Sequence, residues 1–196
     1  RSVSRALERQ RAEIAGRQQL SWEIEQKELY RALSIVDELT GLYNHRHFHE
    51  VLTQELTRAS RYNHPLSLLM IDIDHFKRYQ DVHGHLVGDY TLREVGQTIK
   101  GGCRGADIAA RYGGEEFAVI MPETPKDAAA IAAERLRLAV QGGGRVTVSI
   151  GVAVYPDDAR DKEQLISRAD QALYEAKQAG RNQTKVWMAS PDAPMD

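Results

Sequence analysis

One apolar run constrains the fold of this chain more than any other feature. Residues 66–73 read LSLLMIDI, which is apolar enough for a central strand of a sheet and far too short to span a bilayer. Two carboxylates, Asp72 and Asp74, close this run, and strand alternation puts both on the same face. A carboxylate that closes a buried strand is costly unless it is paired or binds a metal. We therefore expect a charged site at the end of this strand; the alternative for Asp74 is to cap the short helix that follows.

A second pair of carboxylates lies at a predicted hairpin turn. Apolar segments flank Gly113 and Gly114, a pattern typical of a β-hairpin. Glu115 and Glu116 then stand side by side, and adjacent carboxylates repel unless a cation, a proton or a substrate holds them. If the hairpin lies beside the central strand, Asp72 joins them, and three carboxylates suit one or two Mg²⁺ ions that carry a nucleoside triphosphate. The alternative is a solvated hairpin tip.

Composition and charge limit the classes of partner. The chain has 196 residues, of which 42% are hydrophobic and 28% charged, which is enough for one sizeable core plus an appendage. A net charge of −2 gives no general attraction for nucleic acid or anionic membrane, so neither is an expected partner. The single Cys103 excludes a disulfide framework and a cysteine-based zinc site. We expect a cytoplasmic location; because the chain begins at Arg1 without methionine, an upstream sensory or membrane part stays open.

The first 36 residues carry a narrow apolar stripe with mixed charge between its members, a pattern typical of one long helix. Residues 22 positions apart recur on the same face, which corresponds to two periods of 11 residues. We expect a parallel coiled-coil dimer or signalling linker, and the alternative is a helix packed back on its own domain. The stripe consists of Val3, Leu7, Ile14, Leu20, Ile24, Leu29, Leu33 and Val36.

The remaining residues alternate between helical and strand patterns. Asn44 is expected to cap the first helix of the domain, and Thr124 with Pro125 to begin a later one. The order predicts an α+β fold with one central mixed sheet flanked by helices, and a domain of residues 37–188 between the linker helix 1–36 and a disordered tail 189–196. The expected helices are 45–62, 76–82, 89–100, 125–140 and 162–178, and the expected strands are 66–73, the hairpin around 113–114, 145–155 and 185–188.

Five motifs, in order along residues 37–188, resemble the GGDEF family of diguanylate cyclases, here in a GGEEF variant. The resemblance implies a palm-like domain, related to nucleotidyl cyclases, that condenses two GTP into cyclic di-GMP across a homodimer joined by its N-terminal helices. The motifs are Asp37-x-Leu39-Thr40-Gly41-Leu42-x-Asn44, Asp72-x-Asp74-x-Phe76-Lys77, Gly84-His85-x-x-Gly88-Asp89, Arg111-Tyr112-Gly113-Gly114-Glu115-Glu116-Phe117 and Lys177-x-x-Gly180-Arg181-Asn182.

The resemblance also implies roles for individual residues. Asp72, Glu115 and the backbone carbonyl of Ile73 match the family's metal ligands, and Glu116 matches a residue that assists metal binding or deprotonates the hydroxyl. The implied cofactor is Mg²⁺, for which Mn²⁺ can substitute. The implied GTP contacts are Phe76, Lys77, Gln80, Asp89, Gly113, Gly114, Lys177 and Arg181.

Guanine recognition is where the sequence departs from the family. Asp89 matches the family's aspartate, which accepts hydrogen bonds from the guanine edge, but Gln80 stands where relatives usually have asparagine. Glutamine keeps the amide and extends it by one methylene. We expect guanine preference to survive, with weaker binding or slower turnover.

A second ligand site is implied by Arg104 and Asp107, whose spacing before the hairpin resembles the family's inhibitory product site. Arg135 and Arg58 stand at positions that complete such a site in relatives. The implied partner is cyclic di-GMP, which would act as product and as inhibitor. In isolation, an arginine three residues from an aspartate is more often a surface ion pair.

Two other functional classes remain compatible with these residues. A non-catalytic receptor would bind GTP or cyclic di-GMP and only pass on a signal, and a cyclase of relaxed base choice would make mixed products. The intact carboxylates and lysines favour the enzyme over the receptor. A histidine metal site is not expected, because nothing nearby in sequence completes a zinc set around His45 and His49 or around His83 and His85.

Overall fold

A computed structural model describes residues 19, 22, 26 and 34–189 of the chain. The chain divides into two compact units, Arg1–Ile35 and Val36–Asp196, and each is treated by itself. Gln19, Trp22 and Gln26 are helical. The predicted helix 1–36 is wrong at its end, because residues 34 and 35 are not helical and Val36 forms a β-bridge. Its remaining residues, with the coiled coil, and the tail 190–196 lie outside the described residues.

The second unit alternates helices and strands in the predicted order. In the described residues, no helix is long and apolar enough to cross a membrane. The helices are α2 (His45–Tyr62), α3 (Phe76–His83), α4 (His85–Gly102), α5 (Lys126–Gly142) and α6 (Lys162–Gln178), and the strands are β1 (Leu66–Ile73), β2 (Ile108–Arg111), β3 (Glu116–Pro122), β4 (Val148–Tyr155) and β5 (Thr184–Val186).

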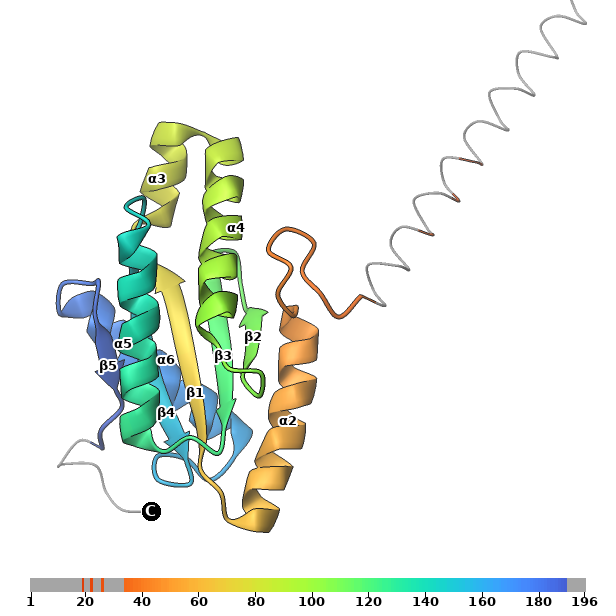
Figure 1. Cartoon of the computed structure of the whole chain (residues 1–196), viewed down its shortest axis with the longest axis vertical. Coiled ribbons are helices and arrows are strands. Elements are labelled where there is room, and N and C mark those ends of the chain that lie inside the picture. Colours follow the sequence, from red (N-terminus) through yellow and green to blue (C-terminus); the bar gives the residue numbers. More distant parts are fainter. Residues whose placement is uncertain (1–18, 20–21, 23–25, 27–33, 190–196) are drawn as a thin grey trace, which may run out of the picture. The chain divides into compact units, whose positions relative to one another are not determined.

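A five-stranded mixed sheet forms the centre, in the order β2-β3-β1-β4-β5 (Figure 1). The strand β1 is buried at all eight positions and pairs antiparallel with β3 on one side and β4 on the other. The last pair, β4 with β5, is parallel. The expected α+β architecture with a central mixed sheet is therefore confirmed, and the sequence of β1 explains its central place because a strand with helices on both faces needs apolar side chains on both.

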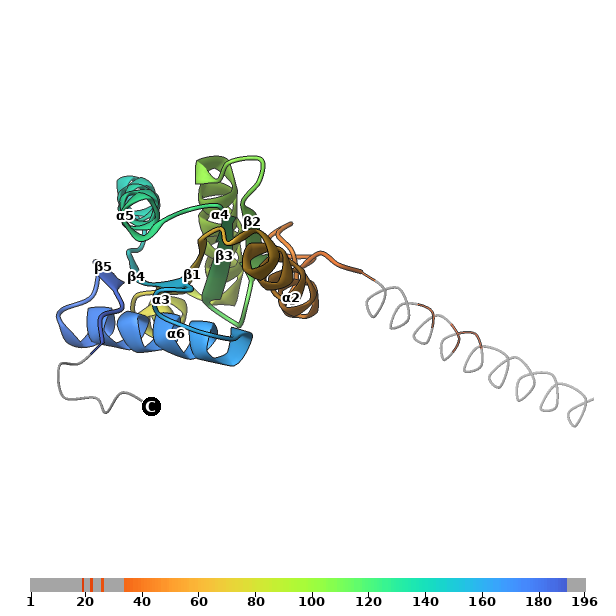
Figure 2. The ribbon, with the colours of Figure 1, turned by 90° about the horizontal axis from the view of Figure 1, so that it is seen from below.

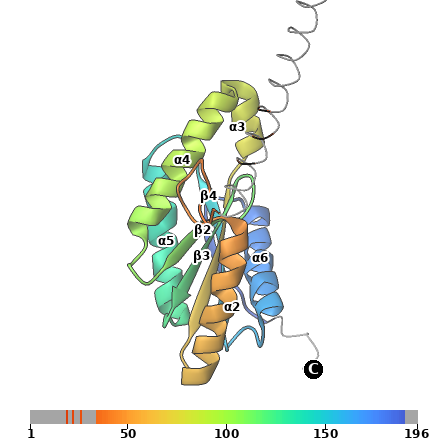
Figure 3. The ribbon, with the colours of Figure 1, turned by 90° about the vertical axis from the view of Figure 1, so that its right-hand side faces the viewer.

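Helices cover both faces of the sheet (Figures 2 and 3). On one face, α4 and α5 pack on alternate strand residues such as Ile71 and Val119, together with Phe76 of α3. On the other face, α2 and α6 pack on the intervening residues, such as Leu68 and Ile120. The sheet therefore separates two hydrophobic cores. The C-terminal end of β1 and the N-terminal end of β3 lie side by side at one edge of these cores.

Several predicted boundaries are confirmed and others are corrected. The bounds of α2, β1 and α6 agree with the prediction, and the Asn44 side chain caps α2 by accepting from the His47 backbone N at 2.9 Å. The helix expected from residue 89 begins four residues earlier, at His85, because Gly88 packs inside the helix and does not break it. The strand expected from residue 145 begins at Val148.

Thr124 does not cap α5, contrary to the prediction. The N-cap position is Pro125, and the Thr124 hydroxyl instead donates to the Pro122 carbonyl at 2.9 Å and accepts from Arg104 at 2.6 Å. A cap needs a side chain free to turn toward the first helical N–H groups. Here tertiary contacts hold the hydroxyl elsewhere.

The segment before α2 is attached to the edge of the sheet. Residues Val36 and Tyr43 form an isolated bridge, and Tyr43 bridges to Ala110 of β2. The Tyr43 carbonyl accepts from the Arg111 backbone N at 2.8 Å. Residues 36–43, which we call the leading loop, therefore extend the sheet beside the predicted hairpin.

Candidate active site

Asp72 lies at the end of β1, in register with Glu116 of β3 and Ser149 of β4. Its carboxylate is only 7% exposed as a residue and pairs with Lys177, the Nζ of which lies 2.7 Å from Oδ2. Burial raises the pKa of the Asp72 carboxyl above its ordinary value, while Lys177 acts in the opposite direction. The helix α6 supplies this lysine from its last turn, because α6 runs across β1 and β4 toward the end where Asp72 lies.

The two glutamates follow a turn stabilised by backbone bonds. The Glu116 carbonyl accepts from the backbone N atoms of Tyr112 and Gly113, at 2.8 and 3.1 Å. The Glu116 side chain folds back over Gly113, so that a Cβ at Gly113 would lie 2.3 Å from Glu116 Oε2. The hairpin predicted at this position is therefore present, and glycine at 113 leaves space for the neighbouring carboxylate.

Glu115 is attached to the end of the central strand. Its carbonyl accepts from the Ile73 backbone N at 3.2 Å. Burial, followed by the charge of Asp72, raises the pKa of the Glu115 carboxyl; Lys177 lowers it and Glu116 raises it further. The charges of Asp72 and Glu116 therefore both act on Glu115. The expected gathering of all three carboxylates around one metal position is not found among the described residues.

Asp74 does not cap the helix that follows it. Its carboxylate accepts from Thr147 Oγ1 at 2.6 Å, Ser149 Oγ at 2.7 Å and the Asn182 backbone N at 3.0 Å. The proposed capping role is wrong, because these three donors occupy the carboxylate. Asp74 instead joins the end of β1 to β4 and to the loop that carries Arg181.

A cleft of about 410 Å³ opens between α3, the hairpin and the end of α6. Carboxylates line one part of it, and lysine and arginine side chains line another. Seven predicted site residues share this cleft: Asp72, Ile73, Phe76, Lys77, Glu115, Lys177 and Arg181. His75, Arg78 and Asp81 also line it, and sequence reasoning did not select them because each is an ordinary polar residue of a helical segment.

The predicted guanine contacts lie on a different part of α3 and α4. The Gln80 side chain packs against Gly88, where an added Cβ would lie 2.6 Å from both Cγ and Nε2 of Gln80. Asp89 follows Gly88 in the chain and lies just beyond the first turn of α4. Neither Gln80 nor Asp89 lines the 410 Å³ cleft, so the structure places these two residues apart from the cations and carboxylates of the cleft.

Sequence reasoning missed a brace beneath the hairpin. The Arg111 Nη1 atom lies 3.2 Å from Asp37 Oδ2 in the leading loop, and its Nη2 donates to the Gly114 carbonyl at 2.7 Å. Asp37 also accepts from the backbone N and the hydroxyl of Thr40, at 2.9 and 2.7 Å. Asp37 and Arg111 are 74 positions apart. The only feature of the sequence that could have indicated their contact is that each belongs to one of the five motifs.

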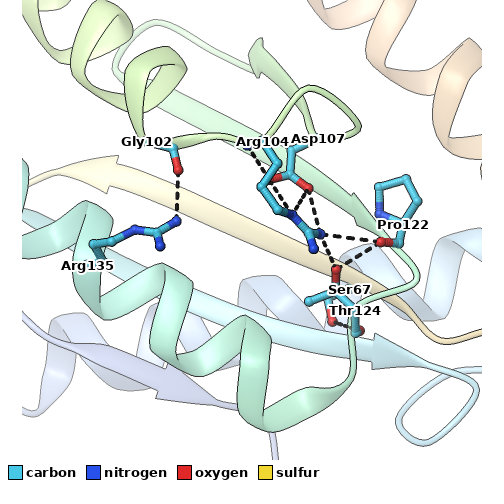
Figure 4. A network of polar contacts seen from close by, with 7 residues as sticks. All are labelled: Ser67, Gly102, Arg104, Asp107, Pro122, Thr124 and Arg135. Carbon is cyan, nitrogen blue, oxygen red and sulfur yellow. Dashed lines mark hydrogen bonds and ion pairs between the residues drawn. The ribbon is translucent and has the colours of Figure 1, made fainter.

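The predicted product-site residues form a polar network around the loop after α4 (Figure 4). Asp107 accepts from the backbone N of Arg104 at 2.8 Å and from its Nη2 at 3.0 Å, and Arg104 Nη2 also donates to Thr124. Arg135 donates to the Gly102 carbonyl at 2.9 Å. Arg58 does not join this network; its contacts are Glu55 and Glu123.

The charge distribution of the cleft suits a divalent cation. Burial disfavours the charged forms of Asp72 and Glu115, and Lys177 forms an ion pair with Asp72. Oxygen ligands of this kind are those that Mg²⁺ and Mn²⁺ prefer. Within the part of the chain that the structure describes, no three His, Cys, Asp or Glu side chains are gathered closely enough to hold a metal, so Asp72 and Glu115 would need the Ile73 carbonyl, water or substrate oxygens to complete a site.

A mixed central sheet with carboxylates and cations at the end of its middle strand defines a domain suited to a nucleoside triphosphate. Comparison with known proteins names the family. Residues 34–183 match the family model described as "Diguanylate cyclase, GGDEF domain". The chain therefore belongs to the GGDEF-domain diguanylate cyclase family, and membership implies a divalent metal requirement.

Individual relatives agree with this assignment. The response regulator PleD of Caulobacter vibrioides is 42% identical over 160 residues, which cover 76% of this chain and 35% of PleD. The GGDEF domain of DgcB from Caulobacter crescentus, solved with cyclic di-GMP, superposes with a TM-score of 0.74 at 34% identity over 78% of this chain and 92% of that one. An active GGEEF domain of a diguanylate cyclase from Vibrio cholerae gives 0.70 at 30% identity over 75% and 98%. The chain thus spans only about a third of PleD.

Proposed function

We propose that this domain condenses two molecules of GTP into cyclic di-GMP and releases two molecules of pyrophosphate. The observation that carries the proposal is the cleft in which Asp72 and Glu115 lie beside Lys177 and Arg181, within a chain of the diguanylate cyclase family. Carboxylates for a metal and fixed cations for phosphates are what attack of a hydroxyl on an α-phosphate needs.

Each group of the cleft has a proposed part in the reaction. Lys77, Lys177 and Arg181 bind the triphosphate and stabilise the leaving pyrophosphate. The Lys177 ammonium has three donors, so it can keep its 2.7 Å bond to Asp72 while it donates to a phosphate. Gly113 and Gly114 let the nucleotide come close to the backbone, and Phe76 lines the same cleft as Lys77.

The proposed metal is Mg²⁺, with Mn²⁺ as a substitute, held by Asp72, Glu115 and the Ile73 carbonyl. When bound, it neutralises charge at phosphorus and lowers the pKa of the attacking hydroxyl. Glu116, folded back over Gly113, assists metal binding or accepts the hydroxyl proton. Gln80 and Asp89 are the proposed contacts to guanine.

One domain holds one GTP, so the reaction requires two domains that face each other. We therefore propose a homodimer in which each copy presents its cleft to the other. The predicted N-terminal helix is the proposed means of bringing the copies together.

A cyclase assay tests the proposal. Purified protein with GTP and Mg²⁺ is expected to yield cyclic di-GMP, detected by mass spectrometry, and Asp72→Asn is expected to lower the rate by about 100-fold or more. Asp81→Asn changes a carboxylate of the same cleft that has no assigned role and serves as the matched control. GTP binding without product at high protein concentration would instead identify a receptor. Product from ATP as readily as from GTP would refute the assignment of Gln80 and Asp89.

We also propose that cyclic di-GMP inhibits the domain through Arg104 and Asp107, with Arg135 beside them. The support is a half-exposed Arg104 guanidinium, fixed by Asp107 at 3.0 Å, in a domain whose relative DgcB was solved with cyclic di-GMP. Arg104→Ala is expected to raise the product concentration needed for half-inhibition by about tenfold or more. Arg58→Ala tests whether Arg58 also contributes, since its side chain pairs with other residues. Unchanged inhibition in Arg104→Ala would remove this site.

A further inference from the structure

Two histidines on α2 form a pair that the proposed reaction does not use. His45 and His49 are one helical turn apart, and their Nε2 atoms lie 3.2 Å from each other. The ring centroids are 4.5 Å apart and the ring planes make an angle of 67°. An end-to-end approach of the two Nε2 atoms would put the ring centroids farther apart than the 4.5 Å observed, so the two rings approach at an angle.

This geometry is close to that of two ligands of one metal ion. Zinc–imidazole bonds of about 2.0–2.1 Å in a tetrahedral arrangement put two ligand nitrogens about 3.3–3.4 Å apart. Histidines four residues apart on one helical face are a known arrangement of metal ligands. A hydrogen bond between the two rings, with the proton on one Nε2, would give the same distance. The hydrogen-bonded pair and the metal-bound pair therefore differ in whether a metal ion replaces that proton.

Carboxylates lie near the pair. His49 lines a groove of about 880 Å³ between α2 and α6, together with the carboxylates Glu163 and Asp170 and the ammonium of Lys162. These carboxylates offset the positive charge that a bound metal ion would bring to the groove. The exposed His45 leaves the site open to solvent.

Contrary to the expectation from the sequence, we propose that His45 and His49 bind one divalent transition-metal ion of the zinc, nickel or copper type, with water in place of further side-chain ligands. Magnesium does not compete, because it prefers oxygen ligands. The inference does not depend on the proposed cyclase activity.

The pair lies beside the hairpin that carries the glutamates. The Tyr112 ring, one residue before Gly113, lies 4.8 Å from His45 and 5.9 Å from His49 between centroids. Phe48 packs edge-on against the same ring at 5.2 Å. A metal that fixes both imidazoles would therefore also restrain Tyr112 and the base of the turn.

Metal titration without nucleotide tests the proposal. Untagged protein is titrated with Ni²⁺ in excess Mg²⁺, which occupies carboxylate sites, and the uptake is followed by calorimetry. About one ion per chain is expected to bind, and His49→Gln is expected to weaken binding by about tenfold or more. His47→Gln is the matched control, since His47 lies on the same helix with its Nδ1 3.3 Å from Glu50, and it is expected to leave uptake unchanged.

A second variant and a second signal make the result decisive. His45→Gln alters an exposed side chain, so its helix content should be unchanged by circular dichroism while its Ni²⁺ affinity falls as in His49→Gln. Imidazole nitrogen NMR signals of His45 and His49 are expected to shift on addition of Zn²⁺, and those of His83 and His85 to stay. Equal Ni²⁺ uptake by the original chain and both variants, or no uptake by the original chain, would overturn the proposal.

Discussion

At the scale of single residues, Glu115 illustrates how a site disposed to bind a cation affects stability. Burial and the charge of Asp72 raise the pKa of its carboxyl, so the folded state holds the proton more strongly than the unfolded state. The fold therefore loses stability as the pH rises above the ordinary value of 4.5, and the loss is still present at neutral pH. Glutamine at position 115 would remove both this loss of folding stability and the proposed metal ligand.

We predict that Glu115→Gln raises the melting temperature at pH 7 by roughly 1–3 °C and that the difference disappears below pH 4.5. Added Mg²⁺ should stabilise the original chain and not the variant. Thermal unfolding at several pH values measures both effects, and Glu175→Gln, an exposed glutamate of α6, is the control. A variant that is less stable than the original chain at pH 7 would contradict the electrostatic account.

The contact between Gln80 and Gly88 shows how the chain accommodates its departure from the family pattern. The longer side chain lies against a glycine where an added Cβ would come within 2.6 Å of its amide nitrogen. We predict that Gly88→Ala displaces the amide and raises the KM for GTP by about tenfold, corresponding to about 1.4 kcal/mol. In the Gln80→Asn background, the shorter side chain should leave room, and the effect of Gly88→Ala should be much smaller.

Steady-state kinetics of the original chain, the two single variants and the double variant measure this coupling. Gly101→Ala, on the same helix with open space around its Cβ position, is the control and should leave KM unchanged. Equal effects of Gly88→Ala in both backgrounds would show that Gln80 is not the residue displaced.

At the scale of elements, the position of α6 depends on one glycine of β4. A Cβ at Gly151 would lie 2.1 Å from the Ala169 carbonyl oxygen and 2.2 Å from the Leu173 nitrogen. These are backbone atoms of a packed helix, which cannot move as a flexible side chain does. The close approach is what brings Lys177, at the end of α6, to Asp72.

We predict that Gly151→Ala lowers the free energy of unfolding by about 3 kcal/mol or more, measured by urea denaturation. Gly142→Ala, with open space around its Cβ position at the end of α5, should change stability by less than about 1 kcal/mol. Near-native stability of Gly151→Ala would mean that α6 can move away from the sheet at little cost.

Sequence patterns predicted elements better than the contacts between them. The bounds of α2, β1 and α6 follow from local period, and the start of α2 also from the predicted cap Asn44, which acts within a few residues. The role of Asp74, the displaced hydroxyl of Thr124 and the brace between Asp37 and Arg111 depend on partners many residues away. Local pattern carries no information about such partners, so these features emerged only from the structure.

At the scale of the whole molecule, the cleft of one chain is half of the proposed reaction centre. Seven of the predicted site residues gather in it, because strand order brings β1, β3 and the end of α6 together. The attacking hydroxyl must come from the nucleotide of a second copy. The rate should therefore depend on how often two copies meet.

We predict that, below the concentration at which the dimer forms, doubling the protein concentration raises the rate of cyclic di-GMP formation about fourfold. Initial rates over a dilution series, with light scattering on the same samples, measure this dependence. Strict proportionality between rate and concentration in samples that scatter as monomers would contradict a shared reaction centre.

The brace in the leading loop has a consequence for how such domains can be recombined. Asp37 is the second residue of its unit, and through Arg111 it is joined to the Gly114 carbonyl at the tip of the turn. A mechanical load applied to the backbone at Val36 would thus reach the turn through one ion pair and one hydrogen bond, in addition to the backbone bonds by which the leading loop joins β2. A protein engineer who exchanges the preceding part of the chain can therefore cut before Val36, keep Asp37, and leave the mechanical connection to the turn intact.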